Sequence, residues 1–301
     1  MLSICIPTYN YNVEKIVADI SRQCDNSAIN FEILVLEDGS AKEFADENNV
    51  IENIKGAKHI VNEQNYGRSV TRNTLADMAK YEKLIFIDCD SAIPDGNFIK
   101  RYLDNYEIDV VCGGTTYNEI QYSPEISLRY TFGIKVEKSS AEKRNKAPYS
   151  AFTTNNMMVS KKIFERIRFC ESLKKYGHED SLFGFDLQQN GIAIKHIDNP
   201  VIHTGIESNK IFLEKTKTGI ENLLAIRNIE GISPDFFNHI RLCRHYNKMK
   251  KLHLLWTIRL AYKMFGKGLE RHLLTAKHPK LMLFNLFKVG YLDEKVEGVK
   301  S

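Results

Sequence analysis

The chain has 301 residues, of which 43% are hydrophobic and 27% are charged, as in ordinary globular proteins. This length predicts one large α/β domain with an appendage, or two domains. Six singly scattered cysteines without a CxxC pair exclude a disulfide scaffold and favour a reducing compartment. The N-terminus lacks the pattern of a signal peptide, and no stretch of uncharged apolar residues is long enough to cross a membrane. We therefore expect a cytoplasmic protein.

Charge is divided unevenly along the chain. Residues 207–301 contain 18 Lys and Arg against 9 Asp and Glu, whereas residues 1–206 contain 24 against 29. The C-terminal third is therefore basic and the remainder is acidic, which bears on partners more than on fold.

Strand and helix patterns alternate through the first 115 residues. The expected strands, all short apolar runs, are residues 2–6, 31–36, 59–61, 84–87 and 110–114. The expected helices are residues 13–24, with apolar residues at the i, i+3, i+4, i+7 spacing, and residues 68–80. Apolar strands that alternate with helices predict a mostly parallel sheet with helices on both faces.

Three of these strands end in polar or acidic loops. The loops are Pro7-Thr8-Tyr9-Asn10, Glu37-Asp38-Gly39-Ser40 and Asp88-Cys89-Asp90. Ligands of such sheets bind beyond the carboxyl ends of the strands, so we expect the three loops to meet at one rim.

The later part of the chain has three sections. Residues 116–150 are polar and basic with little periodicity, and we expect a mobile excursion over the site. Residues 151–205 resume strands and helices, and beyond 206 the chain is helical and basic. We predict one α/β domain over residues 1–205 and a helical basic region over residues 206–301.

Asp88-x-Asp90 directly follows an apolar strand. Two carboxylates there can bind a hard divalent cation that also holds a diphosphate. Asp is also common in strand-end turns, so the motif alone leaves both interpretations open. Glu37-Asp38-Gly39-Ser40 is similarly ambiguous: it fits recognition of a base or ribose, or a turn in which Gly39 has positive φ.

Several motifs occurring together in a fixed order identify a protein family far more specifically than any one motif does. It comprises PTYN from Pro7, EDGS from Glu37, N-x-G-x-x-x-x-R-N from Asn65 to Asn73, DCD from Asp88, TNN from Thr154, F-x-E from Phe169 and GHEDSLF from Gly177. Together these motifs resemble the family-2 glycosyltransferases of the GT-A fold, and the resemblance covers residues 1–205. It implies a nucleoside-diphosphate sugar donor, a divalent metal (Mn²⁺ or Mg²⁺) and inversion at the anomeric carbon.

The resemblance also implies roles for single residues on the donor side. Asp90 would bind the metal, Asp88 would lie near the ribose, and Asp38 would contact the base. The other residues expected to bind the nucleotide sugar are Pro7, Thr8, Tyr9, Asn10, Glu37, Arg68, Arg72 and Cys89. Glu37 replaces the usual Asp, and we expect of Cys89 only a backbone contact. Arg68 and Arg72 fit diphosphate contacts, although arginines on a helix face are commonly solvated.

On the acceptor side, the resemblance makes Asp180 the candidate base. A positioned carboxylate can take the proton of an attacking hydroxyl. Asn155, Asn156, His178 and Glu179 are expected nearby, on the acceptor side. Acidic residues are also favoured at helix N-termini, which is the structural alternative for Glu179 and Asp180. Some family members use a histidine here as a further metal ligand, and His203 is the candidate, unless it only ends a strand.

The basic region contains twelve Lys or Arg and one acid, Glu270, between residues 241 and 288. Interleaved Trp, Phe and Leu residues predict amphipathic helices, which can lie on an anionic membrane. Alternatively, these helices pack their apolar face on the catalytic domain and leave a solvated basic face. No nucleic-acid-binding motif is present, and we expect no nucleic-acid partner.

We therefore expect a metal-dependent, inverting hexosyl- or N-acetylhexosaminyltransferase. It would move a sugar from a UDP-sugar to a hydroxyl of a glycan or lipid-linked saccharide in surface polysaccharide synthesis. Its location would be cytoplasmic, or peripheral on the inner face of the plasma membrane. The alternatives are a sugar nucleotidyltransferase, which would need a Gly-rich phosphate loop, and a catalytically idle membrane-associated nucleotide-sugar-binding or scaffolding protein.

Overall fold

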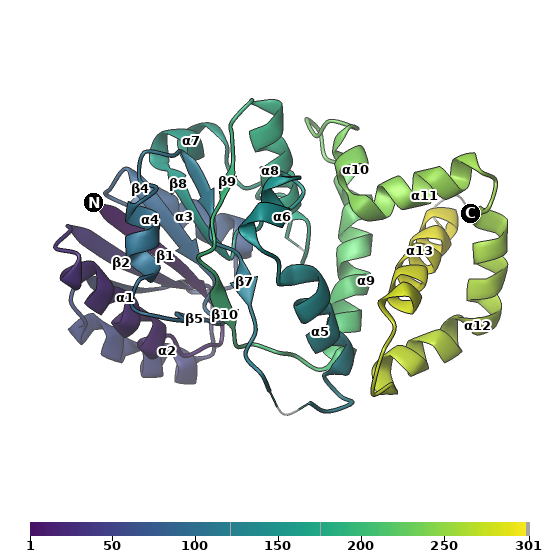
Figure 1. Ribbon diagram of the computed structural model, residues 1–301, viewed down its shortest axis with the longest axis horizontal. Helices are drawn as coiled ribbons and strands as arrows, with labels where there is room; N and C mark the ends of the chain where they lie inside the picture. The colour runs from purple at the N-terminus through teal and green to yellow at the C-terminus, as the bar shows by residue number, and fades with distance from the viewer. Residues whose placement is uncertain (121, 175, 299–301) are drawn as a thin grey trace. The chain divides into compact units, whose positions relative to one another are not determined.

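A computed structural model describes residues 1–120, 122–174 and 176–298 (Figure 1). These residues form two compact units. The first contains residues 1–118, 138–174 and 179–205, and the second contains residues 119–137 and 206–298 with the short stretch that ends at His178. The sequence boundary at residue 205 stays a prediction, since residues 119–137 group with the C-terminal helices.

A seven-stranded sheet forms the centre of the first unit, in the order β3-β2-β1-β4-β8-β6-β9. The strands are β1 (Leu2–Thr8), β2 (Phe31–Glu37), β3 (Ala57–Val61), β4 (Lys83–Ile87), β6 (Val110–Cys112), β8 (Asn156–Ser160) and β9 (Lys195–His196). All pairings are parallel except those of β8, which runs antiparallel to β4 and β6. The mostly parallel sheet predicted from the apolar runs is therefore confirmed.

Helices cover both faces of this sheet. They are α1 (Glu14–Asn26), α2 (Lys42–Asn48), η1 (Asn49–Asn53), α3 (Arg68–Met78), α4 (Phe98–Leu103), α6 (Ala141–Asn145), α7 (Lys161–Arg166) and α8 (Glu179–Gln189). Ile4 and Ile6 of β1 pack with α1 and α4 on one face, while Cys5 packs with α3, α7 and α8 on the other. This alternation follows from the two-residue period of a strand. Full burial of an Ile or Phe side chain contributes about 1.5–3 kcal/mol.

A second, three-stranded sheet joins the DCD loop to the end of the first unit. Its order is β5-β10-β7, with β5 at Ser91–Ala92, β7 at Thr115–Thr116 and β10 at Val201–His203. The antiparallel register pairs His203 with Ser91, the residue after Asp90. Backbone pairing therefore brings together two segments more than a hundred residues apart in the sequence.

The segment 116–150 differs from the expected loop. It contains α5 (Ser127–Phe132), the π-helix η2 (Gly133–Glu137) and α6. Arg144 of α6 is buried and donates hydrogen bonds to the carbonyl oxygens of Cys112, Gly113 and Ile197. Helices of five or six residues make fewer than two turns, so they leave no periodic pattern in the sequence.

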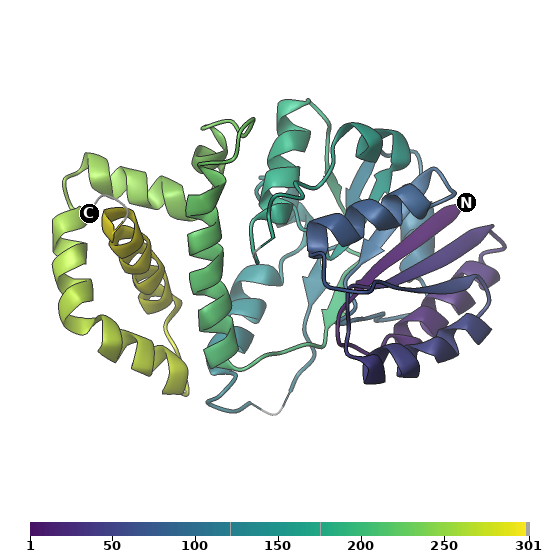
Figure 2. The ribbon, with the colours of Figure 1, turned by 180° about the vertical axis from the view of Figure 1, so that it is seen from behind.

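The second unit is helical, as predicted for the C-terminal region. Its further helices are α9 (Asn209–Ile226), α10 (Phe236–His239), α11 (Arg241–Lys251), α12 (Leu255–Thr275) and α13 (Leu281–Gly298). In both views α13 lies between α9 and α12 (Figures 1 and 2). The Asn209 side chain ties the unit together, since it bonds to Leu128 N at 2.8 Å and to Leu274 O at 3.1 Å. None of the helices within the described ranges is both long and apolar enough to cross a bilayer.

The turn after β2 generates a stability prediction. Gly39 has a φ of +70°, and a Cβ there would lie 2.4 Å from the backbone nitrogen of Asn65. Gly39→Ala should lower the free energy of unfolding by at least about 2 kcal/mol in urea denaturation, since positive φ alone costs about 1–2 kcal/mol. Gly191→Ala is the matched control, because Gly191 has a φ of +66° in open space. Equal losses in the two variants would show that the contact with Asn65 does not matter.

Candidate functional site

The three strand-end loops meet at one edge of the sheet, because β1 pairs with both β2 and β4. The backbone nitrogen of Asp38 donates to Thr8 O at 2.8 Å, and that of Asn10 donates to Ser40 Oγ at 2.9 Å. Asn10 has a φ of 49°, a left-handed conformation that Asn tolerates better than most residues. Tyr9 is the exposed side chain here, at 53%.

Glu37 and Asp38 are buried beneath this rim. Glu37 is 0% exposed, and its carboxylate accepts hydrogen bonds from Asn48 Nδ2 at 2.6 Å and from Ser40 Oγ. Asp38 accepts hydrogen bonds from the backbone nitrogens of Tyr66 and Gly67 at 2.8 and 2.9 Å. Both carboxylates therefore stabilise the neighbouring loops. A direct nucleotide contact by either residue stays a prediction, and the full burial of Glu37 weighs against one.

A buried arginine connects the DCD loop to the start of α8. Arg72, on α3, is only 3% exposed, and its Nη2 donates to Asp88 Oδ1 at 2.9 Å. Its Nη1 lies 3.9 Å from Glu179 Oε1, which also accepts a hydrogen bond from Arg68 Nη1 at 3.3 Å. The Arg72 guanidinium also lies over the Phe169 ring, 5.4 Å from its centroid. Arg68 is half exposed and Arg72 is not, so the two predicted diphosphate contacts lie in different surroundings.

The two acids at the start of α8 have opposite pKa shifts. Burial alone would raise the pKa of Glu179, but the charges of Arg68 and Arg72 more than offset it, and the pKa is lowered. Burial, and then the negative charge of Glu179, raise the pKa of Asp180 to about 6. Asp180 Oδ1 accepts a hydrogen bond from the backbone nitrogen of Ser181 at 2.7 Å. A carboxylate with a pKa near neutrality is suited to proton transfer.

Asp90 and His203 lie side by side, as the β5–β10 register requires. His203 Nδ1 is 3.6 Å from Asp90 Oδ2. Carboxylate and imidazole suit Mn²⁺, and a diphosphate would supply further oxygen ligands. The described part of the chain contains no group of three or more His, Cys, Asp or Glu side chains arranged to hold a metal by themselves. The pair therefore fits a cation shared with a bound diphosphate better than a closed structural site.

Cys89 lies between the two aspartates of this loop. Burial raises the pKa of its thiol to about 12. The thiol therefore stays protonated at neutral pH.

The residues expected on the acceptor side lie in different surroundings. Asn156 is 0% exposed, and its side chain bonds to Tyr102 Oη, Gly114 O and Asn199 O. It therefore holds the interior together and has no side-chain surface left for an acceptor. Asn155 lies beside the DCD loop, because its carbonyl accepts from Asp88 N at 3.1 Å. His178 precedes α8 with a φ of 74°.

Three residues beside Asp90 were missed by the sequence analysis. Thr204 donates through its backbone nitrogen and its Oγ1 to Asp90 O, at 2.9 and 2.8 Å, and Tyr11 Oη lies 2.8 Å from Thr204 Oγ1. A Cβ at Gly205 would lie 2.9 Å from Asp90 Oδ2. The available signal was the His-Thr-Gly sequence that begins with the last residue of β10 and places a small residue against the carboxylate.

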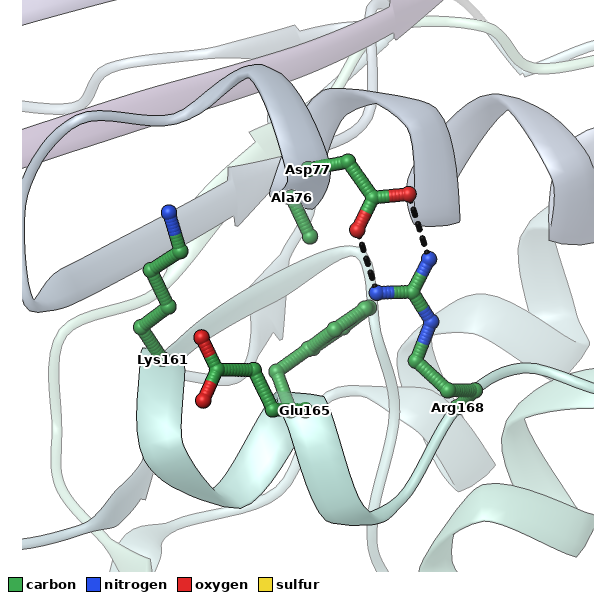
Figure 3. A pocket seen from close by; sticks show the side chains of 6 residues that line it. Ala76, Asp77, Lys161, Glu165 and Arg168 are labelled. Carbon is green, nitrogen blue, oxygen red and sulfur yellow. Dashed lines mark hydrogen bonds and ion pairs between the residues drawn. The ribbon is translucent and has the colours of Figure 1, made fainter.

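A separate pocket of about 190 Å³ lies between α3 and α7 (Figure 3). Asp77 and Arg168, which both line it, form a bidentate ion pair with N–O distances of 2.6 and 2.7 Å. None of the predicted donor or acceptor residues lines this pocket. The candidate site is therefore the rim of strand-end loops.

Comparison with known proteins identifies the class. The profile described as Glycosyl transferase family 2 matches residues 3–168, more than half of the chain. The chain therefore belongs to glycosyltransferase family 2. Its mainly parallel sheet with flanking helices is the GT-A fold.

The chain is similar in sequence to two synthases. Chondroitin synthase from Escherichia coli is 24% identical over 237 residues, which cover 67% of this chain and 34% of the synthase. Hyaluronan synthase from Pasteurella multocida is 23% identical over 232 residues, which cover 65% of this chain and 24% of that protein. The chain thus matches about a third or less of the length of these relatives.

Solved structures with the same fold include a mannosyltransferase and S. aureus TarS. The mannosyltransferase PcManGT from Pyrobaculum calidifontis, in complex with GDP-Man and Mn²⁺, has a TM-score of 0.57 at 13% identity, over 99% of this chain and 86% of that one. S. aureus TarS 1-349 in complex with UDP-GlcNAc has a TM-score of 0.53 at 17% identity, over 99% and 92%. These likenesses support the fold.

The raised pKa of Asp180 predicts how stability depends on pH. The folded protein holds this proton more tightly than the unfolded chain does, so the contribution of Asp180 to stability falls as the pH rises from 3.8 to about 6. Asp180→Asn removes this penalty. The variant should exceed the wild type by about 1–3 kcal/mol in urea denaturation near pH 8 and approach it below about pH 4. A variant less stable than the wild type near pH 8 would contradict the raised pKa.

Proposed function

We propose that this protein is an inverting glycosyltransferase that uses a UDP-sugar and transfers a hexosyl or N-acetylhexosaminyl group. The acceptor is a hydroxyl of a glycan or lipid-linked saccharide in surface polysaccharide synthesis. The observation that carries the proposal is the Asp88–Arg72–Glu179 connection, which links the DCD loop to the residue beside Asp180. The DCD loop and the helix that carries the candidate base are thereby tied to one buried arginine.

Asp180 is the proposed base. The acceptor hydroxyl attacks the anomeric carbon on the side opposite the diphosphate, and Asp180 takes its proton as the new glycosidic bond forms. The bond to the diphosphate oxygen breaks in the same step, which inverts the anomeric configuration. Burial and the ionised Glu179 raise the pKa of Asp180 and so make it a stronger base. Asn155 and His178 are the remaining candidates for contact with the acceptor.

Asp90 and His203 are the proposed protein ligands of a divalent metal, Mn²⁺ or Mg²⁺. When bound, the metal would neutralise negative charge on the diphosphate. Arg68, which is half exposed, is the proposed side-chain contact to the same diphosphate. Tyr9 offers an exposed aromatic face to the nucleobase of the donor, beside Pro7, Thr8 and Asn10.

The known relatives support the acceptor class and the setting. Two of them are named for chondroitin and hyaluronan, which are glycans, and one solved relative holds UDP-GlcNAc. The cytoplasm is the proposed location, at the inner face of the plasma membrane, where lipid-linked acceptors lie. Family membership favours sugar transfer over nucleotidyl transfer, and turnover of a donor would exclude an idle binding protein.

Donor and metal are tested together by thermal shift. Among UDP-, GDP- and dTDP-sugars, UDP-sugars should stabilise the protein only when Mn²⁺ or Mg²⁺ is present, by about 2.7 kcal/mol at a hundred times Kd. Asp90→Asn should abolish this shift and His203→Asn should weaken it. Asp104→Asn removes only an exposed ion pair with Lys100 and should change nothing. An equal shift in EDTA would refute the metal assignment, and a shift with GDP-sugars alone would refute UDP.

The base is tested by turnover. Asp180→Asn should lower kcat by about 10²–10⁴-fold while donor binding persists. In the wild type, kcat/KM should rise with pH through about 6, because the base must be ionised. Asp186→Asn is the matched control: burial also raises the pKa of Asp186, on the same helix, to about 6, but neither arginine acts on it. Equal loss of transfer in both variants, or loss of donor binding with Asp180→Asn, would refute the assignment.

A further inference from the structure

Helix α12 carries a row of large apolar side chains that face water. Trp256, Leu260 and Met264 follow one another at intervals of four residues, and they are 65%, 52% and 64% exposed. Residues four apart lie on the same side of a helix. The opposite side of α12 supplies Ile258 and Leu273 to the buried clusters of the second unit. The exposed row is therefore not needed to fold this unit.

Further exposed apolar residues adjoin the row. Leu252 and Leu254 lie in the turn that leads into α12, at 56% and 44% exposure. Phe265, one residue after Met264, is 64% exposed. Six large exposed apolar residues within residues 252–265 exceed the single scattered ones usual on a globular protein, and such a concentration marks an interaction site.

A row of positive charge runs alongside. Arg259, Lys263, Lys267 and Arg271 are also spaced by four residues, and all are exposed. Arg259 pairs with Asp293 and Glu297 of α13. No ion pair is recorded for Lys263, Lys267 or Arg271 among the residues described.

Among the residues described, acidic side chains pair with Arg259 but not with the other three cations of this row. Glu270 is the only acid between residues 241 and 288, and it pairs with Lys217 of α9. The outer face of α12 therefore combines exposed Trp, Leu and Met with uncompensated positive charge. A tryptophan and aliphatic residues beside lysines suit the interface of an anionic bilayer, where apolar side chains enter the acyl boundary and cations meet lipid phosphates.

We propose that the outer face of α12 docks onto the surface of an anionic phospholipid bilayer. Trp256, Leu260 and Met264 enter the interface, and Lys263, Lys267 and Arg271 bind headgroup phosphates. The docking deepens the proposed function, because a lipid-linked acceptor lies at such a surface. Membrane docking is measured without a sugar donor, so its failure can be distinguished from a failure of the proposed sugar transfer.

The full chain contains its own probe, because Trp256 is its single tryptophan. Adding vesicles of phosphatidylcholine mixed with phosphatidylglycerol should shift the tryptophan emission to shorter wavelength, and brominated acyl chains should quench it. Vesicles of phosphatidylcholine alone should produce neither change. High ionic strength should weaken binding, since screening reduces the attraction between lysines and phosphates.

Variants separate the two rows. Replacement of Lys263, Lys267 and Arg271 by Gln should lower partitioning onto anionic vesicles about a hundredfold. The control replaces Lys42, Lys58 and Lys195, exposed lysines of the first unit, by Gln and should partition within about threefold of the wild type. Leu260→Asn with Met264→Asn should remove the blue shift, while circular dichroism shows the helices intact.

Three results would overturn the proposal. The first is no sedimentation with anionic vesicles. The second is sedimentation without change in Trp256 emission, which would assign binding to another surface. The third is a blue shift that grows with protein concentration in the absence of lipid, which would make this face a contact between copies of the chain.

Discussion

The buried guanidinium of Arg72 is the interaction on which the site depends. It lies at 3% exposure between Asp88 and Glu179, and over the ring of Phe169. A charge in such surroundings is stable only when it is paired, so removing one partner of a buried pair is far more costly than losing a surface ion pair. Three separate stretches of chain, namely α3, the loop after β4 and the start of α8, are thereby held in one arrangement.

The charge of Arg72 also affects the pKa values of the two acids at the start of α8. Arg68 and Arg72 keep Glu179 ionised in spite of its burial, and the charge of Glu179 then raises the pKa of its neighbour. Two adjacent carboxylates on one turn of helix thus acquire different properties. Arg68 hydrogen-bonds Glu179 directly, whereas burial and the charge of Glu179 outweigh the effect of the same arginines on Asp180.

Much of the fold could be predicted from the sequence because its strands are apolar runs. A run such as Leu84–Ile87 must be covered on both faces, and runs of this kind separated by helices define a parallel sheet. The meeting of the three polar loops at one rim followed from that sheet alone. The nearness of His203 to Asp90 did not, because it depends on pairing between two-residue and three-residue strands that have no sequence pattern.

The orientation of side chains within the motifs also could not be predicted from the sequence. Glu37 belongs to a recognisable motif, yet its carboxylate turns inward to Asn48 and Ser40. Asn156, expected beside the acceptor, lies in the interior with Tyr102. An asparagine or a glutamate looks the same in a sequence whether it binds a ligand or hydrogen-bonds buried polar groups. Only its hydrogen-bond partners in the structure distinguish the two roles.

The reversed direction of β8 has a consequence for how such a protein can change over evolution. The chain leaves the rim after Thr115 and returns to it at Asn155, where Asn155 Nδ2 donates to Thr115 Oγ1 at 2.8 Å. The excursion between these residues is therefore closed at its base by the scaffold. Doubling the length of a closed flexible segment costs only about 0.6 kcal/mol. Insertions and deletions can therefore accumulate in the excursion at little cost wherever they leave anchors such as the buried Arg144 in place, so it can vary in length while the scaffold is inherited unchanged.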